Sequence, residues 1–327
     1  MAGKTTSSAD PTMWVGSLHA NVLGTFLNRP RVDPTAAALA EAGASVAFLG
    51  FPWDGTCISR TGTNFGPKGL REASEQFLLF NANTGVDLSA VMKIVDCGDV
   101  AVVPGNSIAT QDRAQALVAT LLNADVLPVI GGGDHSITIG PARAFAKRYP
   151  RCGMIHFDTH LDTANEVGGE SLSHCCPIAR AVDAGFQPQN IVTIGPSGWM
   201  NPRSELAYVR EKGINLITLE DVWKIGPESV GRRAAELASN GTDAVYVTVD
   251  IDVMDAAYAP GTGVPTPGGM TPREIIAIIA GFAGVPIRMI DIAEISPPWD
   301  QAGITARLGM RILLELLSAA ASRVPNH

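Results

Sequence analysis

GMIHFDTHLD, residues 153–162, opens as an apolar run suited to a buried strand and closes with polar side chains at alternate positions. Alternate side chains of a β-strand project to the same face. Asp158, His160 and Asp162 therefore share one side of the chain where the strand ends. Two carboxylates and an imidazole so placed are suited to bind a metal ion. His156 has the same parity but lies deeper in the run, so we expect a hydrogen-bonded core histidine there.

Two further apolar runs end in the same kind of side chain. Residues 244–249, AVYVTV, lead into Asp250 and Asp252, again two carboxylates spaced by two. Residues 126–130, VLPVI, lead into GGGDHS, in which the glycines allow close backbone approach and His135 follows. Any one of these segments alone could be a solvated turn. Three of them, each at the end of a strand-like run, predict one shared metal site.

The charge of this residue set indicates how many ions it holds. Four aspartates gathered in one cleft would carry about four negative charges, and without cations some of them would have to be protonated. Two divalent ions would balance that charge. The donors are oxygen and imidazole nitrogen, which suit Mn(II), Mg(II), Ni(II) or Zn(II). Two neighbouring ions would share a water molecule and lower its pKa enough to form hydroxide near neutral pH.

Apolar, β-branched runs alternate with segments of helical period along most of the chain. This alternation predicts an α/β fold of three layers, with helices on both faces of an eight-stranded, mostly parallel sheet. Ligands of such sheets bind at the carboxyl ends of the strands, where the three candidate segments lie. A closed eight-stranded barrel is the alternative, but the Gly- and Pro-rich loop at 259–270 favours an open sheet. We expect strands near 45–50, 91–95, 126–130, 153–158, 190–194, 215–219, 244–250 and 287–293, and helices at 68–79, 107–122, 137–148, 202–212, 227–239, 271–282 and 301–321.

Length and composition fit a single globular domain with a short extension. The chain has 327 residues, of which 46% are hydrophobic and 17% charged. We assign residues 1–32 to an extended arm and 33–327 to one domain. A net charge of -8 argues against a nucleic-acid surface. The chain shows no membrane-length apolar run, no signal peptide and no paired framework among its five cysteines, so we expect a cytoplasmic protein with free thiols.

The motifs together resemble a known enzyme family. GGGDHS (131–136), FDTHLD (157–162), TVDIDVMDAAYAPGTGVPTPGG (248–269) and DIAEISPPWD (291–300) are similar to the ureohydrolase superfamily of arginases and agmatinases, and closest to its agmatinase-like members. The segment FPWDGTCISRTGTNFGPKGLREAS (51–74) matches as well. The resemblance implies a centre of two Mn(II) ions, or alternatively Ni(II), and hydrolysis of a guanidinium group to urea and an amine. The ligands that it implies are His135, Asp158, His160, Asp162, Asp250 and Asp252.

The resemblance also assigns roles to residues near this centre. Glu294 matches the acidic residue that receives the substrate guanidinium, which a carboxylate can hold through two parallel N–H bonds. A salt bridge at a strand end is the alternative for this residue. His174 matches a loop histidine that carries protons to the leaving amine, with a capping role as the alternative. Asp162 would have a second, catalytic role, in which it accepts a hydrogen bond from the hydroxide.

The substrate is less well defined than the reaction. Cys175 and Cys176 stand where the family usually has Gly-Thr, so they either pack or help to select the substrate. Arginases keep an asparagine that reads the amino-acid head of arginine, whereas here Ala164 fills that position and Asn165 follows it. Guanidinobutyrate, guanidinopropionate, guanidine and alkylated guanidines are alternatives to an agmatine-like substrate. The residues that we expect to contact the substrate are Glu294, His174, Cys175, Cys176 and Asn165.

Other functions stay open at this point. The same fold could carry a deacetylase-like amidohydrolase with a single zinc, although the presence of both His135 and His160 favours two ions. A regulatory subunit is a further alternative, but such subunits commonly lose ligands and none is missing here. We expect a homo-oligomer, a trimer or a hexamer, or a heteromer in which this chain is the active one.

Overall fold

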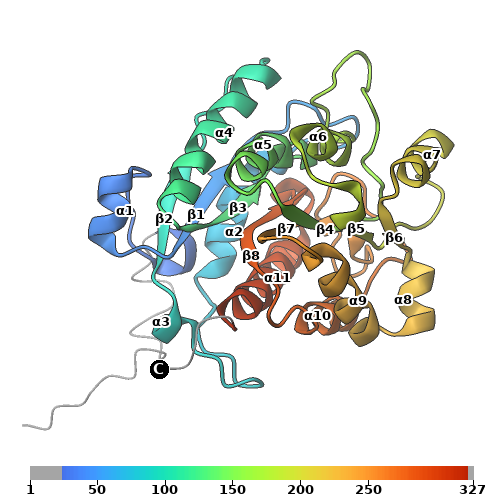
Figure 1. Cartoon of the computed structure of the whole chain (residues 1–327). Helices are drawn as coiled ribbons and strands as arrows, with labels where there is room; N and C mark the ends of the chain where they lie inside the picture. Colours follow the sequence, from blue (N-terminus) through green and yellow to red (C-terminus); the bar gives the residue numbers. More distant parts are fainter. Residues whose placement is uncertain (1–23, 323–327) are drawn as a thin grey trace, which may run out of the picture.

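The computed structural model describes residues 24–322, and these form one sheet with helices on both faces (Figure 1). In chain order the strands are β1 Val46–Phe51, β2 Ile94–Asp99, β3 Leu127–Gly132, β4 Cys152–Phe157, β5 Ile191–Ile194, β6 Asn215–Ile217, β7 Ala244–Asp250 and β8 Ile287–Ala293. Their order across the sheet is β2-β1-β3-β8-β7-β4-β5-β6, and every pair of neighbours runs parallel. The predicted eight-stranded sheet is confirmed, in its open form.

Helices cover both faces of this sheet. In chain order they are α1 Ala36–Ala42, α2 Gly66–Ser74, α3 Leu88–Val91, α4 Ser107–Asn123, α5 Ile139–Arg148, α6 Pro177–Ala184, α7 Arg203–Lys212, α8 Leu219–Ile225, α9 Pro227–Ser239, α10 Pro272–Ala280 and α11 Ile304–Ala321. Helices α4, α5 and α6 form one layer, and α2, α9, α10 and α11 form the other (Figure 1). The three-layer prediction is therefore confirmed. Among residues 24–322, no helix is both long and apolar enough to cross a membrane.

The central strands are apolar on both faces because both faces are covered. Every residue of β4 and β7 is buried. Consecutive side chains of β7 enter different cores: Tyr246 packs in the cluster of buried residues on the α4–α6 side, and Val247 packs in the cluster under α9–α11. Near-continuous burial is typical of a parallel strand between two helical layers.

The strand order decides where the functional residues meet. Strands β3, β8, β7 and β4 are consecutive neighbours in the sheet although they are far apart in the sequence. Since all four run in the same direction, the segments that follow them leave from the same edge. The polar residues after each strand are thereby gathered into one place.

Most helices lie where the sequence predicts them, but their ends and the shortest helices differ. The predicted helix 68–79 ends at Ser74, whose buried hydroxyl donates to the Arg71 carbonyl oxygen and so competes with the backbone for it. The same hydroxyl accepts the Leu27 N–H. Helices α1, α3, α6 and α8 were not predicted. They have seven, four, eight and seven residues, which is too short to display an apolar helical period.

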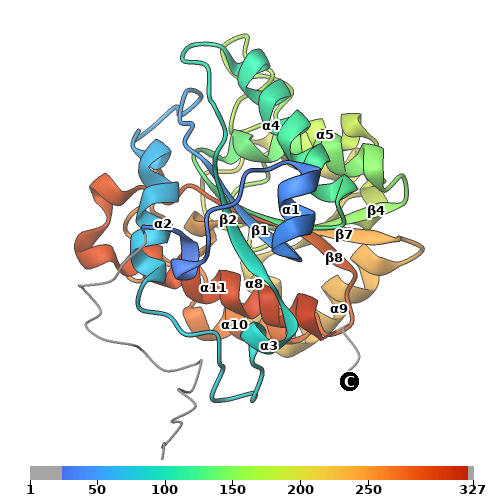
Figure 2. The same cartoon turned by 90° about the vertical axis from the view of Figure 1, so that its left-hand side faces the viewer.

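The predicted arm, residues 1–32, is described only in part, because residues 1–23 lie outside the described residues. Residues 24–32 pack at the β2 edge of the sheet, and Figure 2 shows this segment and α1 beside β1 and β2. Phe26 is fully buried and stacks on Phe48 with ring centroids 4.1 Å apart. Its backbone N–H donates to Asp96 Oδ2 at 2.8 Å. The core of the domain thus begins before residue 33.

Candidate metal centre and active site

The metal-binding side chains predicted from the sequence leave the sheet from three strands. His135 follows β3, Asp158 follows β4, and Asp250 ends β7. Gly133 is needed in the turn after β3, because a Cβ atom there would collide with the Trp53 carbonyl oxygen. This close approach of two backbones directs the next residues of the turn toward the ends of β7 and β4.

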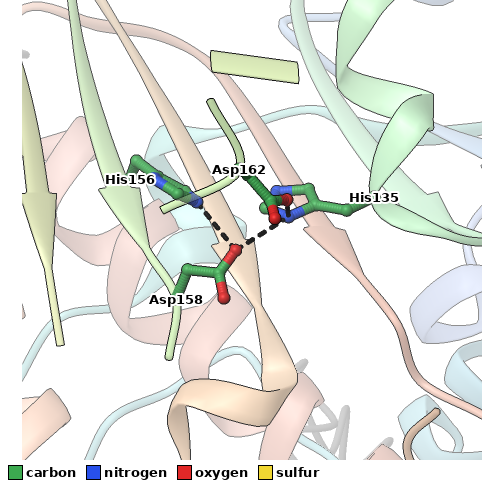
Figure 3. A group of neighbouring side chains, drawn as sticks. All are labelled: His135, His156, Asp158 and Asp162. Carbon is green, nitrogen blue, oxygen red and sulfur yellow. Dashed lines mark hydrogen bonds and ion pairs between the residues drawn. The ribbon is translucent and has the colours of Figure 1, made fainter. Parts of the chain in front are cut away.

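His135 lies at the centre of a first group of ligands. Its Nδ1 atom is 3.1 Å from Asp158 Oδ2 and 2.9 Å from Asp162 Oδ2. The same atom is 3.2 Å from Asp250 Oδ2. All four side chains are buried. Figure 3 shows the dashed contacts of His135 with Asp158 and Asp162.

His160 forms a second group next to the first. Its Nδ1 atom is 3.2 Å from Asp158 Oδ1 and 3.2 Å from Asp252 Oδ2. Backbone N–H groups fix the carboxylates, since Asp252 N–H donates to Asp250 Oδ1 at 2.8 Å. Asp158 therefore contributes one carboxylate oxygen to each group, which makes it the shared member of a two-part cluster.

The first group contains a buried nitrogen atom, Nδ1 of His135, that lacks a hydrogen-bond partner among residues 24–322. Although three carboxylate oxygens surround Nδ1 of His135, none is placed to form a hydrogen bond with it, so within residues 24–322 this nitrogen has no hydrogen-bond partner. One proton could serve only one of the three carboxylates. A cation between them would use the nitrogen lone pair and neutralise the oxygens together. The residues present therefore fit a divalent metal ion.

The electrostatics of the cluster agree with this fit. Burial, and then the charge of Asp158, raises the pKa of Asp162 to about 7. Burial, and then the charges of Asp252 and Asp158, raises the pKa of Asp250 well above its ordinary value. Carboxylates crowded in this way stay ionised when positive charge lies among them. The donors are oxygen and imidazole nitrogen, which suit divalent ions such as Mn(II) or Ni(II).

Buried hydroxyl groups behind His135 determine which ring nitrogen faces the cluster. The Thr248 hydroxyl donates to Asp291 Oδ1 at 2.7 Å, so its oxygen accepts from His135 Nε2, which is 3.0 Å away. Thr138 and Tyr246 also donate to Asp291. With its proton on Nε2, His135 presents an unprotonated Nδ1 to the aspartates. That is the tautomer a metal ligand requires.

His156 supports Asp158 from inside the sheet (Figure 3). Its Nε2 atom is 2.9 Å from Asp158 Oδ2, and its Nδ1 atom is 3.2 Å from the Thr193 hydroxyl. Burial lowers the pKa of His156, so the neutral ring donates to Asp158 and accepts from Thr193. Both nitrogens are occupied, as predicted for a core histidine.

Two residues of the site have a backbone conformation that residues other than glycine rarely adopt. The φ angle is 51° at Asp162 and 62° at Glu294. At Glu294 the surrounding structure holds this conformation in place: its N–H donates to the Gly133 carbonyl oxygen at 2.8 Å, and its Oε1 accepts the His135 N–H at 2.9 Å. Strained residues of this kind concentrate at functional sites.

His174 and Glu294 form a pair beside the candidate metal-binding cluster. His174 Nδ1 is 2.9 Å from Glu294 Oε1, and the Ile58 N–H donates to His174 Nε2 at 3.3 Å. The proton of the imidazole therefore lies on Nδ1 and is donated to Glu294. Within the described residues, Glu294 Oε2 accepts no hydrogen bond from the protein, so it is available to a ligand.

A cavity of about 320 Å³ opens onto the cluster and this pair. Apolar side chains, among them Ile58, Val167, Met200 and Val264, form much of its wall. Of the described residues that line it, none is a lysine or an arginine. The predicted site residues in its lining are His160, Asp162, His174, Cys175, Asp250, Asp252 and Glu294.

Two predicted substrate contacts do not line this cavity. Cys176 is fully buried where α6 begins, and its N–H donates to the Ser173 carbonyl oxygen. Asn165 is exposed, and its Oδ1 accepts from Arg180 at 3.3 Å. Of the cysteine pair, only Cys175 therefore lines the cavity.

Several residues of the site were not predicted. Thr248 lies two positions before Asp250, so strand parity was a signal that it stands behind this candidate ligand on the same face of β7. Cys57 lies close to His174 and Glu294, and burial raises the pKa of its thiol, which keeps it protonated. Glu205 lines the cavity from α7, and no nearby motif marks it in the sequence.

Comparison with known proteins agrees with this geometry. The model of the arginase family matches residues 44–318. The mitochondrial guanidino acid hydrolase of Homo sapiens is 35% identical over 279 residues, which cover 85% of this chain and 78% of that protein. The mitochondrial agmatinase of Gallus gallus is 34% identical, over 84% of this chain and 81% of that protein. The solved structure of proclavaminate amidino hydrolase from Streptomyces clavuligerus has a TM-score of 0.85 and 31% identity, over 94% of this chain and 99% of that one.

Proposed function

Because this chain belongs to the arginase family of hydrolases, we propose that it cleaves a guanidino compound to urea and an amine at a centre of two divalent ions. The observation that carries the proposal is the position of Asp158, which is shared between two groups of ligands. Ions bound there would activate a water molecule as the nucleophile. One ion would be held by His135, Asp158, Asp162 and Asp250, and the other by Asp158, His160 and Asp252.

Residues outside the metal-binding cluster would hold and release the substrate. Glu294 Oε1 is already occupied by two donors, so Oε2 would accept an N–H of the guanidinium and position its carbon. In the reaction, a C–O bond forms, the C–N bond to the tail breaks, and water supplies the proton that the leaving amine takes up. His174, which lines the same cavity, would transfer that proton. Asp162 would accept a hydrogen bond from the attacking water.

The donor set supports Mn(II) as the native ion, with Ni(II) as the alternative. Carboxylate oxygens and imidazole nitrogens suit both, and no cysteine belongs to the two groups that share Asp158. Elemental analysis of purified protein is expected to find two ions per chain. One tightly held ion per chain would contradict the two-ion centre and favour the single-zinc alternative.

The relatives leave the substrate tail open, because their names include both guanidino acid hydrolase and agmatinase. The cavity favours an agmatine-like substrate over a guanidino acid. Its described lining contains no lysine or arginine to pair with the carboxylate of guanidinobutyrate or guanidinopropionate. An agmatine-like compound, with a cationic tail, fits this lining better. Guanidine and alkylated guanidines, which lack a carboxylate, are also compatible with it.

A screen for urea release tests the function directly. Purified protein loaded with Mn(II) or Ni(II) is expected to release urea from agmatine, and more slowly from arginine, guanidinobutyrate and guanidinopropionate. Guanidine and alkylated guanidines complete the set. A variant with His135→Gln, which removes the ligand at the centre of the first group, serves as the inactive control. If the loaded protein released urea from none of these compounds, the proposed function would be wrong.

We also propose that the protein acts in the cytoplasm as a homo-oligomer, either a trimer or a hexamer, or as the active chain of a heteromer. All five cysteines are free thiols, as expected for a reducing compartment. The exposed side chains of Trp199 and Trp223 supply apolar surface of the kind that subunit contacts bury. Light scattering after size-exclusion chromatography would give the mass of the assembly, and a monomer would contradict this part of the proposal.

A further inference from the structure

Glu205 places a second free carboxylate in the cavity, outside the metal-binding cluster. It lies in the first turn of α7 and lines the same cavity as Glu294. Glu205 is only 8% exposed. A carboxylate that is buried to this extent normally has a cationic partner.

The hydrogen bonds of Glu205 use only one of its two oxygens. Oε2 accepts the backbone N–H of Thr163 at 3.0 Å and lies 3.5 Å from the Thr163 hydroxyl. In the described part of the chain no other donor reaches the carboxylate, and no lysine or arginine forms an ion pair with it. Oε1 is therefore left for something that enters the cavity.

The surroundings of this oxygen indicate what it would bind. Burial raises the pKa of Glu205, so a bound positive charge would stabilise its ionised form. Met200 and Val167, which line the same cavity, are apolar, whereas Asn201 in this lining has a buried Oδ1 without a hydrogen-bond partner among residues 24–322 and so offers a cation a further acceptor. An anionic tail beside Glu205 would be repelled by its charge and would meet no lysine or arginine in the described lining.

We propose that Glu205 is the residue that selects the tail of the substrate, and that this tail is cationic. The guanidinium would be held by Glu294, and a terminal ammonium or similar group by Glu205, which lines the same cavity. The substrate class is thus a guanidino compound with a second positive charge. This inference rests on the proposed function and narrows it.

A purely structural role for Glu205 has to be separated from this one. Its bonds to Thr163 tie α7 to the loop that carries the metal-binding residues, because Thr163 directly follows Asp162. Glu205→Gln separates the two roles: the amide oxygen can still accept the Thr163 N–H, while the negative charge is lost. An exposed glutamate of the same loop, Glu166, supplies a matched control, since Glu166→Gln makes the same charge change outside the cavity.

The test compares agmatine with butylguanidine, which has the same guanidinium and the same number of tail carbons but lacks the terminal amine. For Glu205→Gln we expect the ratio of kcat/KM for agmatine to kcat/KM for butylguanidine to fall roughly tenfold, the effect of about 1.4 kcal/mol, mainly through KM for agmatine. Because it is a ratio, this quantity does not depend on the fraction of folded, metal-loaded protein. Glu166→Gln should leave it unchanged.

The outcomes distinguish this inference from the function on which it rests. An unchanged ratio in Glu205→Gln, or an equal fall for both compounds, would show a structural role and overturn the inference while the hydrolase function stands. Preferential cleavage of guanidinobutyrate over agmatine by the wild-type protein would also overturn the inference while the hydrolase function stands. Absence of urea from every guanidino compound would defeat both.

Discussion

Thr248 fixes which nitrogen of His135, a proposed metal ligand, faces the aspartates, although Thr248 does not line the cavity. Its hydroxyl donates a hydrogen bond to Asp291 and therefore accepts one from His135 Nε2. If the hydroxyl were absent, either ring nitrogen of His135 could carry the proton. The tautomer with the proton on Nδ1 would point a hydrogen, rather than a lone pair, at the bound ion.

Replacement of this hydroxyl by a methyl group should therefore weaken metal binding. For Thr248→Val we expect the affinity for Mn(II) to fall by about 10- to 100-fold, the usual effect of losing such a supporting hydrogen bond. Calorimetric titration of metal-free protein measures it. Thr262→Val is the control, because the Thr262 side chain is equally buried but its hydroxyl makes no hydrogen bond within residues 24–322. Equal affinity of Thr248→Val and wild type would contradict the tautomer argument.

Single residues differ in how well the sequence predicts them. Asp158, His160 and Asp162 were recognisable because strand parity puts them on one side of the chain, and the structure gathers them as expected. Glu205 was not recognisable, because it lies in α7, distant in the sequence from the predicted motifs. Only the packed fold brings it to the cavity. Cys176 was predicted to contact the substrate and does not. Its neighbour Cys175 lines the cavity, whereas the side chain of Cys176 is buried in the core.

A buried ion pair between Arg71 and Asp96 connects several elements at the β2 edge of the sheet. Arg71 of α2 donates from Nε to Asp96 Oδ2 at 2.7 Å and from Nη2 to Asp96 Oδ1 at 3.0 Å. Asp96 also accepts the N–H groups of Phe26 and Gly98. Thus one carboxylate joins β2, α2 and the segment before α1.

Removal of this carboxylate should destabilise the fold. Asp96→Asn is expected to lower the free energy of unfolding by about 3 kcal/mol at neutral pH, because it leaves the buried charge of Arg71 without its main partner. Urea denaturation measures the change. Asp112→Asn is the control, since the pair of Asp112 with Arg143 is long, at 3.9 Å, and largely exposed. Equal unfolding midpoints for Asp96→Asn and wild type would contradict this prediction.

The same pair predicts how the stability depends on pH. Burial opposes ionisation of Asp96, but the hydrogen bonds from Arg71 and from Phe26 N–H outweigh it and lower the pKa of Asp96 below the ordinary value of 3.8. A carboxylate with a depressed folded pKa stabilises the protein above its unfolded pKa and loses that contribution as the pH falls. The stability difference between wild type and Asp96→Asn should therefore be constant near neutral pH and shrink below about pH 4. A difference that grows in acid would contradict the assignment.

Elements were predictable in proportion to their length and periodicity. All eight strands and the long helices lie close to their predicted ranges, and α9 has the bounds expected. The seven-residue α8 was missed although Thr218 and Asp221 form a capping box at its start, with both bonds present. For helices this short, caps are a better signal than an apolar period. The core role of Phe26 could not be read locally, because its partner Phe48 is supplied by the fold.

The whole molecule should depend on its ions for stability as well as for activity. Four aspartates meet in one buried cluster, and their mutual repulsion opposes folding when no cation is present. An ion available at 100 times its Kd would add about 2.7 kcal/mol to the folded state, so removal by a chelator should lower Tm by roughly 5 °C or more. Differential scanning calorimetry, with metal content checked by elemental analysis, measures the shift. In His135→Gln the chelator should have a smaller effect, and an unchanged Tm in verified metal-free wild type would contradict the prediction.

The positive φ angles at Asp162 and Glu294 have a consequence for directed evolution. Glycine adopts such angles without steric cost. At Glu294 a glycine would leave the buried N–H of His135 without its acceptor, but at Asp162 it would relieve backbone strain and also remove a negative charge from a crowded site. Both effects at Asp162 favour the folded state of the metal-free protein, and the change removes a carboxylate that we propose for catalysis. A library of variants selected for heat resistance alone would thus drift toward inactive proteins at Asp162. Selection for thermostability and for turnover would have to be applied together.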